Sequence, residues 1–304
     1  MISKYTYKKL TWIDLETPTS EEVRSIIEEY RLPDILGEEL TMPILRSKVD
    51  RYDNNISLVL HFPTLHRNKK QERSEQEVDF IIGKNFVITA HEEPVDALNE
   101  FSKLFEINSV LEESLSGDHA GYLFFAMIRE MYRHTFLELE TVSSAIRDIE
   151  RKLFDGNEHS MVSAISRENR ILVDFRQTLR FHREVLASFN RAATDFFGGD
   201  FSYYLGALTG EYNKVEQMLD GERETLSDLR NTNDSLLASK TNDVMKKLTI
   251  MNFIMLPLGL ITWIFAMRSD IVFIRGTNDF LLVLIGMILI AVVMYIYFKN
   301  KKWL

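Results

Sequence analysis

Two long runs without a charged residue, near the end of the chain, are its clearest hydrophobic pattern. Residues 248–267 read LTIMNFIMLPLGLITWIFAM, and residues 280–298 read FLLVLIGMILIAVVMYIYF. Each run can cross a hydrocarbon core about 30 Å thick as a helix. Core helices of soluble proteins rarely run so far without a charge, which disfavours a buried soluble hairpin. The pattern predicts a transmembrane region over residues 248–304 with two spans.

The first part of the chain mixes strand and helix signals. The segment LTWIDLE (residues 10–16) predicts a strand, and TPTSEEVRSIIEEY (17–30) predicts a helix with a hydroxyl cap and acids in its first turn. The segments at residues 54–65 and 78–94 carry β-branched and aromatic residues around a turn at 83–85, which is typical of strands joined in a hairpin. We therefore expect a cytoplasmic α/β domain over residues 1–116.

Residues 117–247 carry the spacing of long helices. Apolar residues recur at intervals of three and four within residues 121–154 and 161–192, which predicts two long amphipathic helices. A third helical pattern starts near Tyr203 and meets no proline before the first span, so we expect one helix about 100 Å long. Such a helix needs partners along its length, so self-association is expected. The expected fold class is an α+β membrane protein.

Charge indicates how the chain is oriented. The net charge is −9, but residues 241–304 hold seven basic and three acidic residues, which leaves −13 on the first 240. An acidic body does not favour nucleic acid as a partner. The polar N-terminus does not resemble a signal peptide, and lysines flank the outer ends of both spans, at positions 246, 247, 299, 301 and 302. Arg268 and Arg275, in the connection, weaken this argument without reversing it. We expect a multi-pass protein of the cell (inner) membrane with both termini cytoplasmic.

Motifs of enzyme chemistry do not occur in the sequence. It has no cysteine, which excludes disulfides and thiolate metal sites. It has no P-loop, dinucleotide-binding fingerprint or HExxH motif. The histidines lack close metal-ligand spacing and are best interpreted as structural or surface residues: His61, His66, His91, His119, His134, His159 and His182. We predict neither an enzyme nor a bound cofactor, and the sequence identifies no metal site.

One face of the first span and the helix before it combines polar and apolar side chains. The residues fall at intervals of three, four or seven: Asn242, Met245, Thr249, Asn252, Leu256, Trp263 and Met267. Polar groups such as Asn252 within a span either line water or hydrogen-bond to a neighbouring helix, and both roles stay open. Pro257 bends a span or frees a carbonyl group.

The same region resembles a known family. The segments KTNDVMKKLTI and LPLGLITWIFAM, followed by a second span and the ending YFKNKKWL, closely resemble the CorA family of divalent-cation transporters. The matching positions are Lys240, Thr241, Asn242, Met245, Lys246, Leu248, Thr249, Ile250, Pro257 and Leu258. The expected order of α/β domain, long helices and two C-terminal spans also agrees with this family.

The resemblance implies a homopentamer in the lipid bilayer, with the first spans around a central pore and the second spans as an outer ring. It implies a cytoplasmic funnel built from the domains before the spans. Seven pore-lining residues are implied by the resemblance, and Thr249 joins them because it lies on the same helical face. The full set is Asn242, Met245, Leu248, Thr249, Asn252, Leu256, Gly259 and Trp263. Ions would pass largely hydrated, because amides and apolar groups do not replace the waters of magnesium.

The sequence departs from the family at the predicted pore mouth, which comprises Ala266, Met267, Arg268 and Asp270. Ala266, Met267 and Arg268 stand where the family has Gly-Met-Asn, so an arginine replaces the asparagine. Five arginines about 10 Å from a dication would repel it by roughly 4 kcal/mol in a water-like dielectric, less after screening. Arg268 can instead turn outward to lipid phosphates, and both orientations remain open.

Two further departures concern gating. Trp263 stands where the family usually has glycine, so the indoles either narrow the pore or pack against the neighbouring span. Ala207 stands where magnesium-gated relatives carry aspartate, which argues against the family's regulatory magnesium site. Acids further along the helix offer carboxylates, but their interpretation as unpaired surface acids is favoured: Asp220, Asp228 and Asp234.

These observations predict a pentameric CorA-like transporter that passes divalent metal cations of the magnesium, cobalt, nickel or zinc type, with altered selectivity or gating. The alternative is a degenerate relative that conducts no divalent cations and acts as an anion-permeable pore or a membrane scaffold. The arginine at position 268 motivates this alternative.

Overall fold

The computed structural model describes residues 1–44, 46–65, 75–106, 119–266 and 277–301. The chain forms two compact units, Met1–Arg230 and Asn231–Leu304. The first unit is an α/β domain with a layer of long helices, and the second holds the rest of the longest helix and one further helix, each with an apolar run. Fold class and element types therefore agree with the sequence prediction.

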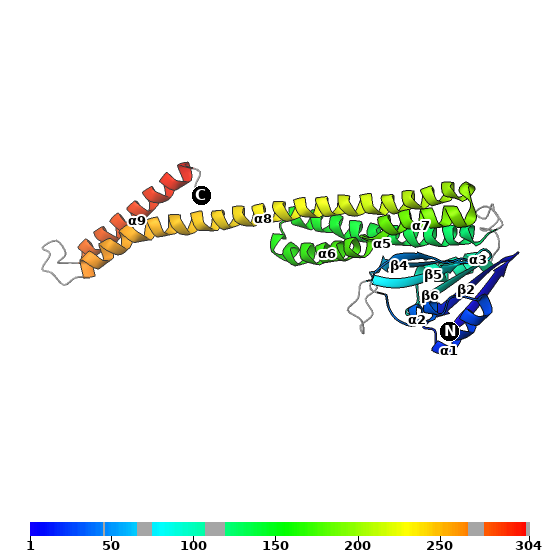
Figure 1. Cartoon of the computed structure of the whole chain (residues 1–304). Coiled ribbons are helices and arrows are strands. Elements are labelled where there is room, and N and C mark those ends of the chain that lie inside the picture. The colour runs from blue at the N-terminus through cyan, green and yellow to red at the C-terminus, as the bar shows by residue number, and fades with distance from the viewer. Residues whose placement is uncertain (45, 66–74, 107–118, 267–276, 302–304) are drawn as a thin grey trace. The chain divides into compact units, whose positions relative to one another are not determined.

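A six-stranded mixed sheet organises the N-terminal part (Figure 1). Its strands lie in the order β1-β2-β6-β5-β4-β3, with only β2 and β6 parallel among the described pairs. The bounds are β1 (Ile2–Tyr7), β2 (Leu10–Glu16), β3 (Lys48–Arg51), β4 (Ile56–Pro63), β5 (Glu75–Ile82) and β6 (Phe86–His91). The predicted strand at residues 10–16 and the predicted hairpin, β5–β6, are confirmed, whereas β1 and β3 at the sheet edges were not predicted.

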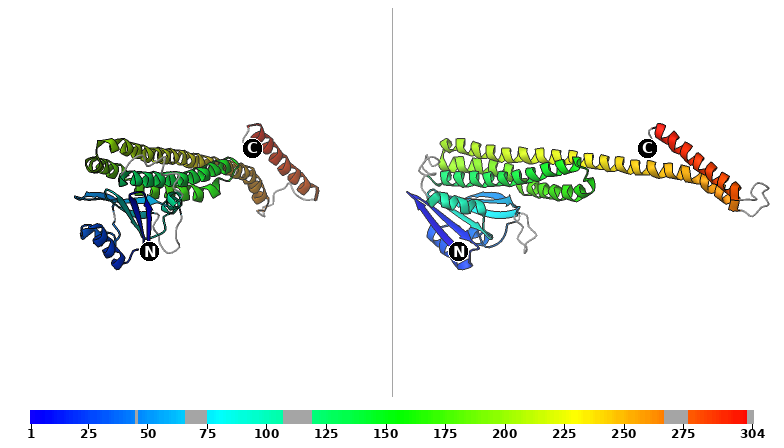
Figure 2. Two further views of the ribbon diagram at one scale, coloured as in Figure 1. Left: turned by 90° about the vertical axis from the view of Figure 1, so that its right-hand side faces the viewer. Right: turned by 180° about the vertical axis from the view of Figure 1, so that it is seen from behind.

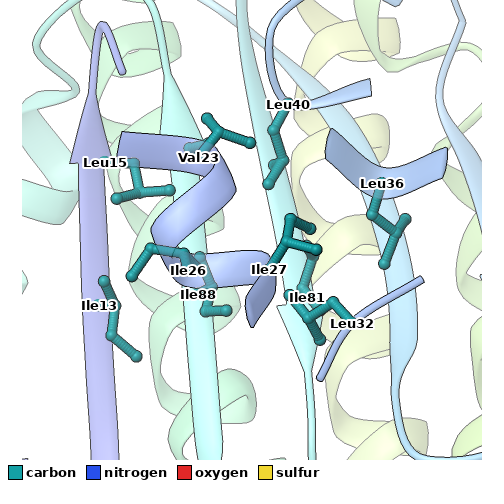
Figure 3. Packing of buried hydrophobic residues seen from close by; sticks show 11 residues of the cluster. Ile13, Leu15, Val23, Ile26, Ile27, Leu32, Leu36, Leu40, Ile81 and Ile88 are labelled. Carbon is teal, nitrogen blue, oxygen red and sulfur yellow. The ribbon is translucent and has the colours of Figure 1, made fainter. Parts of the chain in front are cut away.

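Helices α1 (Ser20–Tyr30) and α2 (Ile35–Glu39) cover one face of the sheet. Side chains of α1 such as Val23 and Ile27 pack on Ile13 of β2 and Ile88 of β6 (Figure 3). Helix α1 starts with a capping box. The Thr19 hydroxyl accepts a hydrogen bond from the Glu22 backbone amide, and the Glu22 carboxylate accepts one from the Thr19 backbone amide. The predicted hydroxyl cap is therefore present.

The other face of the sheet carries α3 (Asp96–Glu106) and α5 (Ala120–Phe154). Successive residues of a strand point to opposite faces, so Trp12 meets the ring of Phe101 on α3 at 5.6 Å while its neighbour Ile13 faces α1. Phe80 of β5 contacts Phe124 of α5, at 5.4 Å between ring centroids. Both faces of the sheet are thus buried, which explains why β4 is buried along its whole length.

The helical layer continues with α6 (Glu158–Leu179), α7 (His182–Phe197) and the start of α8 (Ser202–Ala266), which lie beside α5 (Figure 2). The single helix predicted over residues 161–192 is wrong, because the chain breaks between α6 and α7 at residues 180–181. His182 follows the break and is fully buried, with hydrogen bonds to Tyr132 of α5 and to the His61 carbonyl of β4. These long-range contacts hold the start of α7 in place.

The predicted long helix is confirmed, since α8 is one helix of 65 residues with Pro257 inside it. In the second unit, α9 (Thr277–Asn300) returns along the last turns of α8, and Phe253 contacts Phe298 at 6.3 Å between ring centroids (Figure 1). By length and composition, the end of α8 and α9 can both cross a membrane, and few of their residues are buried within the chain. Lipid or other copies must cover such apolar surfaces.

Candidate ion pathway

The predicted pore-lining residues all lie on α8, within the second unit. Their positions on an ideal helix follow from 3.6 residues per turn. Seen down the helix axis, they occupy an arc of about 120°, with Leu248 at one end, Trp263 in the middle and Asn242 at the other end. We call this set the α8 stripe: Asn242, Met245, Leu248, Thr249, Asn252, Leu256, Gly259 and Trp263.

The α8 stripe is exposed within one chain. Its most exposed apolar members, Leu256 and Trp263, are 65% and 74% exposed, and Asn242, Thr249 and Asn252 are exposed as well. Only Gly259 is partly enclosed. The stripe therefore needs a partner other than the described parts of its own chain.

The opposite side of α8 is the enclosed one. Ile250 is buried, and Ile254, Leu258 and Ile261 are half-buried. On the ideal helix these four residues centre roughly 180° from the middle of the α8 stripe. The contact between Phe253 and Phe298 shows that α9 packs beside this span, and on the ideal helix Phe253 falls between the two sides, roughly 80° from the middle of the α8 stripe. One chain thus covers one side of its first span and leaves the stripe free.

The hydroxyl groups of this span bond to their own helix. Thr249 donates from Oγ1 to the Met245 carbonyl at 2.8 Å, and Thr262 does the same to the Leu258 carbonyl at 2.8 Å. The hydrogen of each hydroxyl is therefore used, while oxygen lone pairs remain. On the α8 stripe, Thr249 offers an acceptor and Asn252 an amide oxygen, which suit the water hydrogens of a hydrated cation.

The predicted pore mouth lies largely outside the described residues. Met267, Arg268 and Asp270 are not described, and Ala266 is the last residue of α8, without a described side chain. The roles of these four residues, like the assignment of the α8 stripe to a pore, stay predictions.

The carboxylates considered for a regulatory metal site do not converge. Asp220 pairs with Arg223 at 3.5 Å, and Asp228 and Asp234 are exposed. In the described ranges, no three acidic or histidine side chains meet as a metal cage. These acids are surface residues along α8.

Three histidines have clear structural partners in the first unit. Burial lowers the pKa of His182 to about 4, and its two ring nitrogens bond at 2.8 Å to Tyr132 and to the His61 carbonyl. Burial is the largest single influence on the pKa of His61 and His91 and lowers both, but the combined attraction of the carboxylates of Glu77 and Asp14 and of weaker neighbouring groups outweighs it, so both pKa values are raised. The interpretation of these residues as satisfied structural histidines fits this geometry.

A large polar N-terminal body followed by two apolar helices, with a free stripe on the first, defines a two-span membrane protein. The family described as CorA-like Mg2+ transporter protein matches residues 7–301. The chain therefore belongs to the CorA family, and family and fold agree with the expectation from the sequence.

Individual relatives cover most of the chain. The cobalt/magnesium transport protein CorA of Thermotoga maritima is 28% identical over 296 residues, which are 97% of this chain and 83% of that protein. The solved CorA magnesium transporter of Methanocaldococcus jannaschii has a TM-score of 0.82 at 20% identity and covers 100% of this chain and 98% of its own. The full-length CmaX protein has a TM-score of 0.72 at 15% identity, with coverages of 97% and 89%. These likenesses show a shared fold.

Proposed function

We propose that the protein is a homopentameric transporter that conducts divalent metal cations through a pore formed by five copies of α8, with α9 outside them. Family membership supports the activity, and two relatives in the same family, from Thermotoga maritima and Methanocaldococcus jannaschii, are named cobalt/magnesium transport proteins. The orientation with both termini in the cytoplasm is part of the proposal and rests on the lysines that flank the spans.

The observation that carries the proposal is the placement of the α8 stripe. A stripe that holds Asn252 and Thr249 is costly to expose to lipid tails, because the Asn252 amide would lack partners there and the Thr249 hydroxyl would keep only its bond to the Met245 carbonyl. The enclosed side of α8 lies opposite, which leaves the stripe available for contact between copies of the chain. A closed ring of copies then places the stripe around a shared axis.

The chemistry of the α8 stripe suits a cation that keeps its water. Amide and hydroxyl oxygens accept hydrogen bonds from coordinated water, and in a pentamer Leu248 and Leu256 would supply an apolar constriction on either side of them. Magnesium gives up its waters reluctantly, so such a path passes the hydrated ion without a cage of protein ligands. The arginine at position 268 adds positive charge near the mouth and is the proposed cause of altered selectivity or gating.

The test is uptake of magnesium or cobalt into proteoliposomes that contain the purified full chain. We expect uptake above that of empty vesicles, driven by the ion gradient or a negative interior. Absence of uptake of magnesium, cobalt, nickel and zinc alike would contradict the proposal.

A matched pair of variants tests the path itself. Thr249 and Thr262 make the same hydrogen bond to their own helix, but only Thr249 belongs to the α8 stripe. Thr249→Val removes the remaining acceptor from the path, and we expect it to lower magnesium uptake severalfold. Thr262→Val should leave uptake unchanged. Equal effects of both variants would place the path elsewhere.

A further inference from the structure

A cavity of about 210 Å³ in the first unit lies apart from the proposed ion path. It opens at the edge of the sheet where the parallel strands β2 and β6 both end, with Glu16 of β2 opposite His91 of β6. The carboxyl ends of neighbouring parallel strands are a common place for ligands. The walls come from the residues after β2, from the end of α2 and the loop after it, from β5, and from the end of β6.

The register of β5 explains how its acids reach this cavity. Residues 75, 77, 79 and 81 share one face of the strand, because side chains alternate. Ile81 belongs to the core beneath α1 and α2, whereas Glu75, Glu77 and Asp79 line the cavity. The cavity is therefore the place where the α1–α2 layer ends before the edge of the sheet.

The walls carry a large excess of acidic groups. Six described lining residues have carboxyl groups, and one, His91, has a basic side chain. The acids are Glu39, Glu75, Glu77, Asp79, Glu92 and Glu93. Such a wall favours a cationic ligand.

Two buried carboxyl oxygens of the lining residues accept no hydrogen bond from the part of the chain that the structure describes. They are Oδ1 of Asp79 and Oε2 of Glu39. The other oxygen of Glu39 accepts from Lys48 at 2.6 Å, and Glu77 accepts from the Ile44 amide at 2.8 Å. Burial raises the pKa of Asp79 well above its usual value, and the carboxylates of Glu77 and Glu39 raise it further, against a lowering effect of Lys48. A buried acceptor without a donor is costly, and a ligand that donates hydrogen bonds removes that cost.

The arrangement of the acids selects the class of cation. Within the described ranges, no three of them converge as a metal cage. The lining also includes apolar residues, among them Pro18, Leu40 and Met42. An aliphatic polyamine matches this wall, because its ammonium groups donate to separated carboxylates while its methylene groups contact apolar side chains.

We propose that this cavity binds an aliphatic polyamine of the putrescine or spermidine type, with one ammonium group donating to the Asp79 carboxyl group. The site lies in the α/β domain and does not depend on the proposed transport activity.

Calorimetric titration of the purified full chain with spermidine, in 150 mM salt to suppress non-specific attraction, tests the proposal. We expect saturable binding that Asp79→Asn weakens at least tenfold. Glu21→Gln removes one charge from the exposed start of α1, outside the cavity, and should change the affinity less than twofold. Absence of saturable binding, or equal weakening in both variants, would overturn the site.

Thermal unfolding of the same samples separates loss of binding from loss of fold. Asp79→Asn keeps the side-chain shape and removes an unpaired carboxyl, so its melting temperature without ligand should not fall below that of the unmodified protein. Spermidine should raise the melting temperature of the unmodified protein and of Glu21→Gln, but not that of Asp79→Asn. Should Asp79→Asn fail to fold, the double variant Glu92→Gln/Glu93→Gln at the same cavity takes its place, with the same expected loss of binding. Saturation by magnesium alone at this site, without spermidine binding, would contradict the assignment to a polyamine.

Discussion

Lowering the pH should destabilise the first unit through His182. The imidazole is fully buried, and its Nε2–H donates to the His61 carbonyl while Nδ1 accepts from the Tyr132 hydroxyl. The carbonyl can only accept, so Nε2 carries a hydrogen, and in the neutral ring Nδ1 is then free to accept from the Tyr132 hydroxyl. The ring of Tyr212 stacks nearby, at 6.1 Å between centroids, and within the described surroundings no carboxylate bonds to His182. A proton on His182 therefore adds a charge without a counter-ion.

The size of the effect follows from the pKa. Burial lowers the pKa of His182 from about 6.5 to about 4. A depressed pKa means that the unfolded chain binds the proton more readily, so stability present above pH 6.5 is lost as the pH falls toward 4. Between pH 7.5 and pH 5 this histidine should lower the free energy of unfolding by about 2 kcal/mol. For a unit of this size the loss corresponds to a fall in melting temperature of roughly 4–8 °C.

The assay compares thermal unfolding of the full chain and of His182→Gln at both pH values. His61 and His91 have raised pKa values and act in the opposite direction, so only the difference between the two proteins isolates His182. We expect the difference in the free energy of unfolding between the two proteins to be about 2 kcal/mol smaller at pH 5 than at pH 7.5. His134→Gln, which changes a partly exposed histidine on α5, is the control. A gap that does not change with pH would refute the reasoning.

Three further predictions concern packing, capping and charge. Phe124→Ala removes a fully buried ring that contacts Phe80 and should cost about 4 kcal/mol in thermal unfolding, whereas Phe154→Ala, at the exposed end of the same helix, should cost little. Thr19→Ala removes the cap of α1 and should cost about 1 kcal/mol in denaturant unfolding; no loss would mean that the cap is not formed in solution. Arg268→Asn should raise magnesium uptake at least tenfold if the arginine faces the axis, and unchanged uptake would refute that placement.

Patterns of local origin could be predicted from the sequence. The two spans, the unbroken α8 and the capped α1 each follow from a run, a missing proline or a short motif. The edge strand β1 could not be predicted in this way. Its exposed and half-exposed positions hold residues such as Lys4 and Thr6, so the segment shows no clear hydrophobic face in the sequence. The break before His182 depends on partners 50 and 121 residues away, which no local pattern encodes.

The two candidate sites also differ in how far a local sequence pattern predicts them. The α8 stripe lies on one helix, so its spacing in the sequence already predicted a shared face, and the structure added only that the opposite side is the enclosed one. The acidic cavity joins Glu39 of α2, Asp79 of β5 and His91 of β6, which come together only through the strand order of the sheet. Pairs of acids along β5 were the one signal in the sequence, and such pairs are common on solvated strands.

The central claim, that the α8 stripe lines the ion path, is most directly tested by thiol modification during transport. The chain has no cysteine, so a single introduced thiol is the sole target. Leu256→Cys lies on the α8 stripe, and Ile254→Cys lies on the enclosed side. A trimethylammonium thiol reagent places up to five positive charges on one ring, which at about 10 Å repel a dication by roughly 4 kcal/mol before screening. The account predicts at least a tenfold loss of magnesium uptake for Leu256→Cys and none for Ile254→Cys. Full uptake in modified Leu256→Cys, or an equal loss in both variants, would contradict it.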